Sequence, residues 1–139
     1  MANWKTIMAN YESNDCESLG EYAYEHMVEL LDYFKASYPE KQAADYAFYC
    51  AIYFVNIDKF CDGAEEDVLR VAVADYTHDL NFNLIQKNFD RNGLSSVVEN
   101  LMRRAPSRIR EVFARLGCAI CSAKGYISDT ERKVILGWV

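Results

Sequence analysis

The chain has 139 residues, of which 51% are hydrophobic and 26% are charged, and its formal net charge is −6. These values are typical of a globular domain of ordinary size, and the acidic balance argues against nonspecific binding to nucleic acid. Only six glycines and two prolines occur, so we expect no long linker. We therefore interpret residues 1–139 as one domain, in which 1–17 form a peripheral helix or arm.

The chain has five cysteines, an odd number, and most of them lie in apolar runs such as Tyr49–Ile52. Buried, reduced thiols explain this pattern and predict a reducing, cytoplasmic location. The pair Cys118 and Cys121 has Cys-x-x-Cys spacing inside an apolar helix, which favours core packing over redox chemistry or zinc binding. Residues 1–10 show no signal-peptide pattern, and no apolar run is long enough to span a membrane.

Helical periodicity dominates the chain. Apolar side chains recur every three or four residues from Leu19 to Phe34, the pattern of an amphipathic helix. Ser18 and Ser37 are each followed three residues later by a glutamate, so we expect capping boxes at the starts of this helix and the next. Similar capping patterns, together with proline and glycine punctuation, predict further helices. Their expected ranges are 37–55, 62–72, 80–91, 95–104, 106–125 and 128–138, with a weaker helix at 4–9. The sequence thus predicts an all-α bundle of about seven helices with short connections.

The segment from Ala43 to Val55 is apolar on nearly every side. Such a helix is typical of the centre of a domain or of an oligomer interface. Its tyrosines at positions 46, 49 and 53 share one stripe of the helix. Burial of that stripe is the simpler interpretation, and a ligand cleft lined by these rings is the alternative.

Two loops, 57–65 and 123–131, align without gaps when the sequence is shifted by 66 residues. Each loop lies between a long apolar helix and a capped one. The sequence therefore predicts two helix-loop-helix units related as a pseudo-repeat.

Both loops resemble the pattern Ala-Asp-Gly-x-Ile-Ser-x-x-Glu of the TerB-like (tellurite-resistance B) family. The first loop retains Asp58 and Glu65 but has Lys59 in place of glycine and Cys61 in place of isoleucine. The second loop has Lys124 in place of aspartate and matches the pattern at five positions, which are Ala123, Gly125, Ile127, Ser128 and Glu131.

The resemblance implies an all-helical bacterial domain without catalytic activity. It also implies an association with stress response, with membrane-proximal complexes and in some members with divalent metal. The candidate ligands for such a metal are Asp58, Asp62, Glu65, Asp129 and Glu131. Both loops carry a lysine beside these residues, and a lysine ammonium can replace a cation in a salt bridge. Helix capping alone explains Glu65 and Glu131, so we expect no cofactor beyond a weakly bound divalent cation.

Charge is unevenly distributed along the chain. Residues 1–86 carry 16 acidic and 5 basic side chains, whereas residues 87–116 carry 3 acidic and 7 basic ones. The arginines selected as candidate partner-binding residues are Arg103, Arg104, Arg108 and Arg115. Arg108 and Arg115 are seven residues apart, so we expect them on one face of their helix. A positive patch on an acidic protein attracts an acidic partner, an anionic membrane surface or a second copy of the chain. The alternative is that these arginines neutralise the acidic first long helix within the fold.

No residue grouping marks a catalytic site, so we expect the chain not to be an enzyme. The leading hypothesis is a helical interaction or adaptor domain of TerB-like type. A divalent-metal-dependent sensor that uses the loops at 58–65 and 123–131 is the second. A ligand-binding protein or enzyme with its site in the aromatic helix layer is the third.

Overall fold

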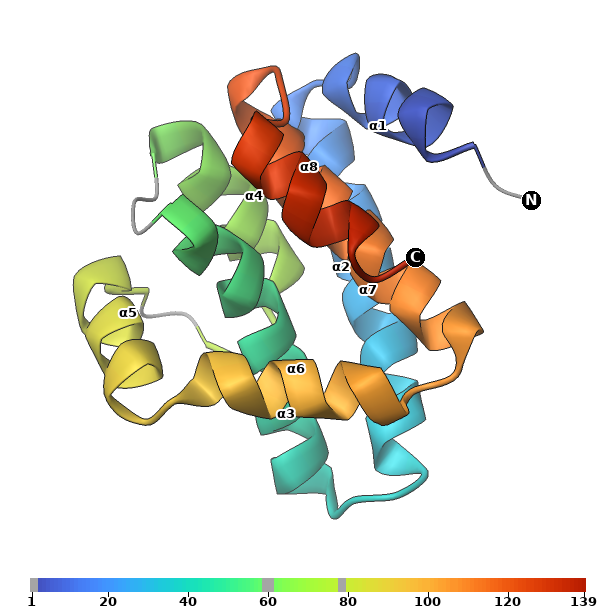
Figure 1. Ribbon diagram of the computed structural model, residues 1–139. Helices are drawn as coiled ribbons and strands as arrows, with labels where there is room; N and C mark the ends of the chain where they lie inside the picture. The colour runs from blue at the N-terminus through green and yellow to red at the C-terminus, as the bar shows by residue number, and fades with distance from the viewer. Residues whose placement is uncertain (1–2, 59–61, 78–79) are drawn as a thin grey trace.

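The computed structural model describes residues 3–58, 62–77 and 80–139, and within these ranges its regular elements are helices (Figure 1). The expected all-α bundle is confirmed, with eight α-helices among the described residues instead of about seven. In chain order they are α1 Trp4–Glu12, α2 Cys16–Lys35, α3 Glu40–Val55, α4 Gly63–Ala72, α5 Phe82–Arg91, α6 Leu94–Arg104, α7 Ser107–Cys121 and α8 Asp129–Leu136. The additional helix is α1, which is longer than the weak helix expected at 4–9.

Helix α2 packs mainly against α3, α4 and α7. Its buried side chains include Leu19, Ala23, Met27, Leu30 and Phe34, which confirms the predicted apolar stripe. The expected capping box at Ser18 is wrong, because the helix begins earlier, at Cys16. Asp15 caps it instead and accepts a hydrogen bond from the Ser18 amide at 2.8 Å.

Helix α3 is buried over the whole stretch from Cys50 to Val55, as its sequence predicted. Other helices of the same chain cover it, chiefly α2, α6 and α7. Figure 1 shows α6 crossing α3 on one side of the molecule. The expected capping box before α3 does not form, since Pro39 is the N-cap residue and makes no side-chain capping bond.

Helix α5 lies at the edge of the bundle (Figure 1) and packs mainly against α3 and α6. Phe89 is its one buried residue, and Leu84 is 62% exposed. Gly93 adopts φ 61°, a left-handed conformation that suits glycine and allows the chain to turn from α5 into α6. This helix is therefore held by much less buried surface than α2, α3 or α7.

The pseudo-repeat appears in the local structure. A 3₁₀ turn, η1, spans Asn56–Asp58 after α3, and a second, η2, spans Ser122–Lys124 after α7. These turns are 66 residues apart, as are the N-cap residues Asp62 and Ser128 of the helices that follow. Both N-cap side chains accept a hydrogen bond from a glutamate amide three residues later. The register predicted by the sequence alignment is thus confirmed at the described ends of the two loops.

None of the described helices combines the length and hydropathy that crossing a bilayer requires.

Replacing Gly117 with alanine should destabilise the protein, although alanine normally favours a helix by up to about 1 kcal/mol over glycine. A Cβ at Gly117 would lie 2.4 Å from the Phe54 ring, and that ring is itself buried against Phe113. Over-packing of this kind costs about 1–3 kcal/mol, which urea unfolding followed by circular dichroism would measure.

The matched control is Gly63→Ala at the start of α4, where no described atom lies within 4 Å of the added Cβ. This variant should be as stable as the parent or slightly more stable. Equal effects of the two substitutions would contradict the close packing of α7 against α3.

Candidate functional site

The two predicted loops meet through α4 and η2, which pack against each other. Glu65, in the first turn of α4, is 3% exposed, and Glu131, in the first turn of α8, is fully buried. Lys124 in η2 lies close enough to both glutamates for their charges to act on it. The fold therefore brings charged residues of both loops to one junction.

Lys124 forms a salt bridge with Glu131, with 2.6 Å between Nζ and Oε1. The same ammonium donates a hydrogen bond to the Cys121 carbonyl oxygen at 2.9 Å. Glu131 Oε1 also accepts from the Ser128 amide at 2.8 Å, while the Ser128 hydroxyl accepts from the Glu131 amide, completing a capping box. Lys124 thus supplies a cation at the position where the TerB-like pattern has aspartate.

The pKa values of this pair show that both groups are charged near neutral pH. Burial alone would lower the pKa of Lys124, but the hydrogen bond and charge of Glu131 outweigh burial and raise it. Burial alone would raise the pKa of Glu131, but hydrogen bonds from Lys124 and Ser128 outweigh burial and lower it. The stabilisation from this pair is therefore present between the ordinary pKa values of a glutamate and a lysine.

Two further candidate metal ligands, Asp62 and Asp129, lie at the starts of helices. Asp62 serves as the N-cap of α4, and Asp129 is exposed at the start of α8. Asp58 ends η1, and its side chain lies outside the described residues, as do Lys59 and Cys61. Among the described residues, no group of three or more His, Cys, Asp or Glu side chains could hold a metal ion.

The Cys-x-x-Cys pair lies deep in α7, where Cys118 and Cys121 are both fully buried free thiols. Burial raises the pKa of Cys118 to about 12, and it raises that of Cys121 well above its ordinary value with help from Glu131. Such thiols are poor nucleophiles at neutral pH. These observations agree with the core role that the sequence predicted for them.

The candidate arginines fall into two groups. Arg103, Arg104 and Arg108 are exposed where α6 leads into α7. Arg115 is half-buried beneath α1, with its guanidinium 5.4 Å from the centre of the Trp4 ring. Sequence spacing placed Arg108 and Arg115 on one face of a helix, but α1 covers Arg115. Only the first three remain available as a partner-binding patch, and that role stays a prediction.

Arg115 belongs to a polar cluster that fastens α1 to the bundle. In this cluster Tyr11 on α1 and His26 on α2 share a hydrogen bond of 2.7 Å. Burial, assisted by the charge of Arg115, lowers the pKa of His26 to about 4. Nearby, Arg132 on α8 pairs with Glu12 on α1 at 2.8 Å. Helix α1, in the segment expected to be a peripheral helix or arm, is therefore anchored to α2 through Tyr11 and to α8 through Glu12.

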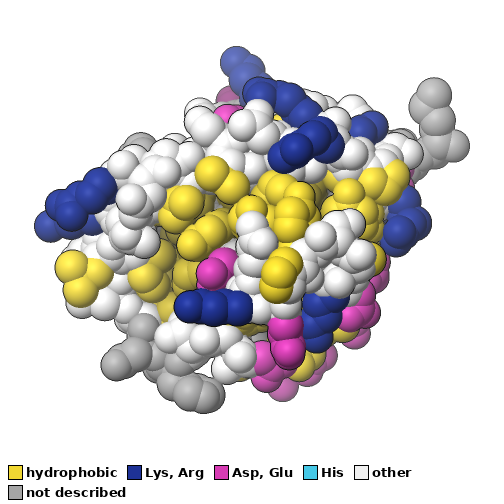
Figure 2. Space-filling model, turned by 90° about the horizontal axis from the view of Figure 1, so that it is seen from below, with side chains coloured by type: hydrophobic (Ala, Val, Ile, Leu, Met, Phe, Trp, Pro, Cys, Tyr) yellow, Lys and Arg dark blue, Asp and Glu magenta, His cyan; other side chains and the backbone are white. Residues whose placement is uncertain are grey.

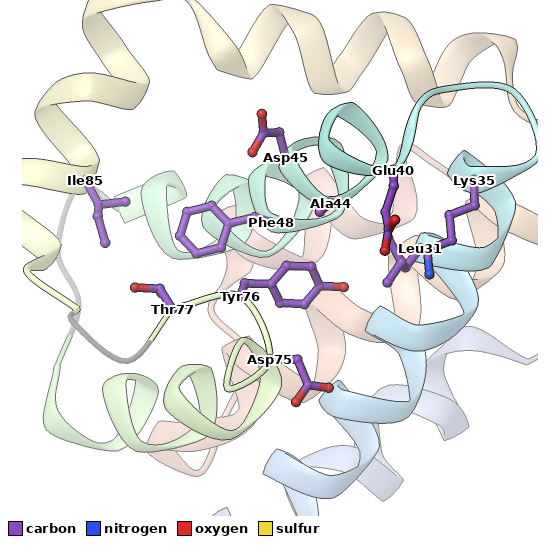
Figure 3. A pocket seen from close by; sticks show the side chains of 10 residues that line it. All are labelled: Leu31, Lys35, Glu40, Ala44, Asp45, Phe48, Asp75, Tyr76, Thr77 and Ile85. Carbon is purple, nitrogen blue, oxygen red and sulfur yellow. The ribbon is translucent and has the colours of Figure 1, made fainter.

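A groove that the sequence analysis did not identify lies between α3, α5, the end of α2 and the turn after α4. It is open to solvent, has a volume of about 520 Å³, and its lining residues are Leu31, Lys35, Glu40, Ala44, Asp45, Phe48, Asp75, Tyr76, Thr77 and Ile85. Figure 3 shows Phe48 and Tyr76 in its middle, with Asp45 and Asp75 on opposite sides. This lining combines an apolar floor with charged edges, as binding clefts commonly do.

The groove is not lined by Tyr46, Tyr49 or Tyr53, the stripe for which a ligand cleft was the alternative to the expected burial. Tyr53 is buried and donates a hydrogen bond to Glu99 at 3.2 Å. Tyr46 packs edge-on against Tyr38, and Tyr49 is half-buried beside Phe48. The neighbouring Phe48 faces the groove instead, because one position along α3 turns the side chain by about 100°.

Seen from below, the molecule carries a band of hydrophobic side chains (Figure 2). Lys and Arg side chains lie around the edge of this band, and Asp and Glu side chains gather on one side of it. Apolar patches bordered by charge are typical of surfaces that contact other proteins.

No family model, curated protein or solved structure matches the chain. The TerB-like resemblance therefore rests on the loop residues alone.

Replacing Lys124 with methionine should destabilise the protein at pH 7 by about 3–5 kcal/mol, since it leaves the Glu131 charge buried without its partner. The deficit should shrink as the pH falls towards 4, because protonation of Glu131 removes the uncompensated charge. Urea unfolding at several pH values would measure both effects.

The double variant Lys124→Met/Glu131→Gln provides the control. It should be more stable than the sum of the two single substitutions implies, because the two residues interact directly. Additive effects with no dependence on pH would show that the salt bridge contributes nothing to folding.

Replacing Arg115 with alanine should raise the pKa of His26 above about 4, since the guanidinium charge contributes to the lowered value. It should also cost about 1–2 kcal/mol through the lost contact with Trp4. A proton NMR titration of the His26 ring and urea unfolding would test the two effects.

Arg108→Ala is the matched control in the same helix, and it should change the free energy of unfolding by less than about 0.5 kcal/mol. An unchanged His26 titration in Arg115→Ala would contradict the anchoring cluster.

Proposed function

We propose that this chain is a non-catalytic helical interaction domain of TerB-like type that uses the groove between α3 and α5 to bind a partner protein. The observation that carries this proposal is the groove itself, with its apolar floor, opposed carboxylates and open access. Its volume of about 520 Å³ would accommodate several side chains of a partner.

Two features support an interaction domain over a metal-dependent sensor. Glu131, the most buried of the candidate metal ligands, already has its charge compensated by Lys124. Hydrogen bonds to the Cys121 carbonyl and from the Ser128 amide hold the two side chains of the salt bridge. A divalent cation would have to displace an ammonium that is bonded to both the carboxylate and the backbone. The loops therefore favour a structural role.

The arginine patch, formed by Arg103, Arg104 and Arg108, is the second contact surface in this proposal. It lies on α6 and α7, outside the set of residues that line the groove. A partner that carries both basic and acidic segments would be able to use both surfaces.

Site-specific photo-crosslinking tests the proposal. A photoreactive amino acid placed at Ala44, which lines the groove, should give one dominant protein adduct in the native host. Mass spectrometry would identify the crosslinked segment, and that segment, synthesised as a peptide, should bind the purified chain with 1:1 stoichiometry.

The control places the same amino acid at Leu136 on α8, which is 46% exposed and outside the groove. Identical adducts from both positions, or no adduct from Ala44, would contradict the assignment of the groove as the docking site.

A further inference from the structure

We propose that the groove between α3 and α5 binds a cationic amphipathic helix, a segment with an apolar stripe flanked on both sides by lysine or arginine. This inference rests on the proposed function and specifies the chemistry of the partner. It follows from the arrangement of apolar and charged side chains around the groove.

The centre of the groove is apolar and aromatic. The rings of Phe48 and Tyr76 lie 6.4 Å apart, centre to centre, and Ile85 lies at one end (Figure 3). All three side chains are half-buried, so a ligand would remove further apolar surface from water. Each Å² of apolar surface buried in this way contributes about 25 cal/mol. The occupant therefore needs an apolar stripe of its own.

The two sides of the groove are acidic. Asp45 on α3 and Asp75 after α4 lie on opposite sides of the aromatic centre, while Lys35 and Glu40 lie together at the other end (Figure 3). The opposite charges of Lys35 and Glu40 offset each other there. Asp45 and Asp75 form no salt bridge within the described part of the chain. A ligand with cations on both flanks would supply the missing charge.

Asp75 is held in position by Tyr24 on α2. Its Oδ2 atom accepts a hydrogen bond from the Tyr24 hydroxyl at 2.5 Å. The charge of Asp75 also adds to burial in raising the pKa of Tyr76 to about 12, so this tyrosine stays neutral. The carboxylate therefore stands preorganised at the groove edge, where it would form a charge-assisted hydrogen bond with little loss of entropy.

The length of the groove suits a short helix. From Glu40 to Phe48 the axis of α3 advances by about 12 Å, which corresponds to roughly two helical turns. A helix lying along this direction would present an apolar residue at every third or fourth position to the aromatic centre. Cationic residues on either flank of that stripe would then reach Asp45 and Asp75.

The wider field of the molecule favours the same partner. The first 86 residues, which include every residue that lines the groove, carry 16 acidic against 5 basic side chains. Such a surface attracts cationic ligands and speeds their association at low salt. Lys87 and Arg91 on α5 do not line the groove.

Fluorescence anisotropy with a labelled peptide tests this inference. The probe is a 14-residue helix of leucine and lysine with an apolar stripe. One comparison peptide has glutamate in place of lysine, and another has the same leucine and lysine content without the stripe. The amphipathic lysine peptide should bind at least about tenfold more tightly than either, and its affinity should fall with added salt.

Two substitutions at Asp45, which is exposed, test whether the lysine peptide binds in the groove. Asp45→Asn should weaken binding of the lysine peptide by about threefold and Asp45→Lys by about tenfold or more. Asp129→Lys, which makes the same charge change on exposed α8, should alter it by less than about twofold. Unfolding curves should show that all variants remain folded, with Asp129→Lys slightly less stable because α8 loses an acidic residue from its first turn.

Several results would overturn the inference. Tighter binding of the glutamate peptide, equal binding of the peptide without a stripe, or equal effects of Asp45→Lys and Asp129→Lys would each do so. Displacement of the lysine peptide by micromolar spermine would show that charge alone suffices. If the chain self-associates and both Arg104→Glu and Asp45→Lys abolish this association, the groove binds a second copy of the chain.

The outcomes separate this inference from the proposed function. If Ala44 crosslinks to a partner through an acidic or uncharged segment, the groove is a docking site but the cationic helix is wrong. If Ala44 yields no adduct, the docking function itself fails.

Discussion

The close packing of α7 constrains the position of most other helices. From Val112 to Cys121 every residue except Arg115 is buried, and the helix packs against α1, α2, α3, α4 and α8. Gly117 lets α7 approach α3 so closely that the Phe54 ring occupies the space of a side chain. Interiors packed in this way tolerate little change in volume. The groove and the arginine patch, for which we propose a function, are therefore formed by helices whose positions α7 constrains.

The buried salt bridge between Lys124 and Glu131 illustrates how a charged loop is accommodated beside that framework. A buried carboxylate is costly unless hydrogen bonds and an opposite charge satisfy it. Here Lys124 and the Ser128 amide both bond to Oε1 of Glu131, and the end of α7 bonds to the Lys124 ammonium. The buried charge in the loop that resembles the TerB-like pattern is thus compensated by a lysine of the same chain. For this reason we propose a function for the groove instead of for the loops.

Local patterns predicted the parts of this structure that depend on local physics. The stripe from Leu19 to Phe34 and the apolar run of α3 identified core helices, because burial follows helical periodicity. The alignment of the two loops predicted the common register in which Glu65 and Glu131 follow their N-cap residues. The cap of α2 was misplaced by three residues, since Asp15 and Ser18 are both good N-cap residues and only the fold selects between them.

The groove could not be predicted in the same way. Its lining comes from α2, α3, α5 and the turn after α4, so it exists only once tertiary packing brings Phe48 and Tyr76 together. The sequence did contain one signal, the acidic excess of residues 1–86. The sequence indicated that a lysine in these loops could form a salt bridge, and Lys124 does so with Glu131. It did not indicate that α1 covers Arg115, because spacing within one helix does not reveal what packs on that helix.

A core built around α7 supports a groove whose outer wall, α5, is held by less buried surface, and we expect this wall to adapt to a ligand. Local opening is expected where few apolar side chains are buried, and α5 buries only Phe89. Native-state hydrogen exchange followed by mass spectrometry measures this difference directly. Amides of α7 should exchange only through global unfolding, and those of α5 should exchange at least about a hundredfold faster through local opening. Equal protection of α5 and α7 would contradict an adaptable wall and would leave a groove of fixed shape.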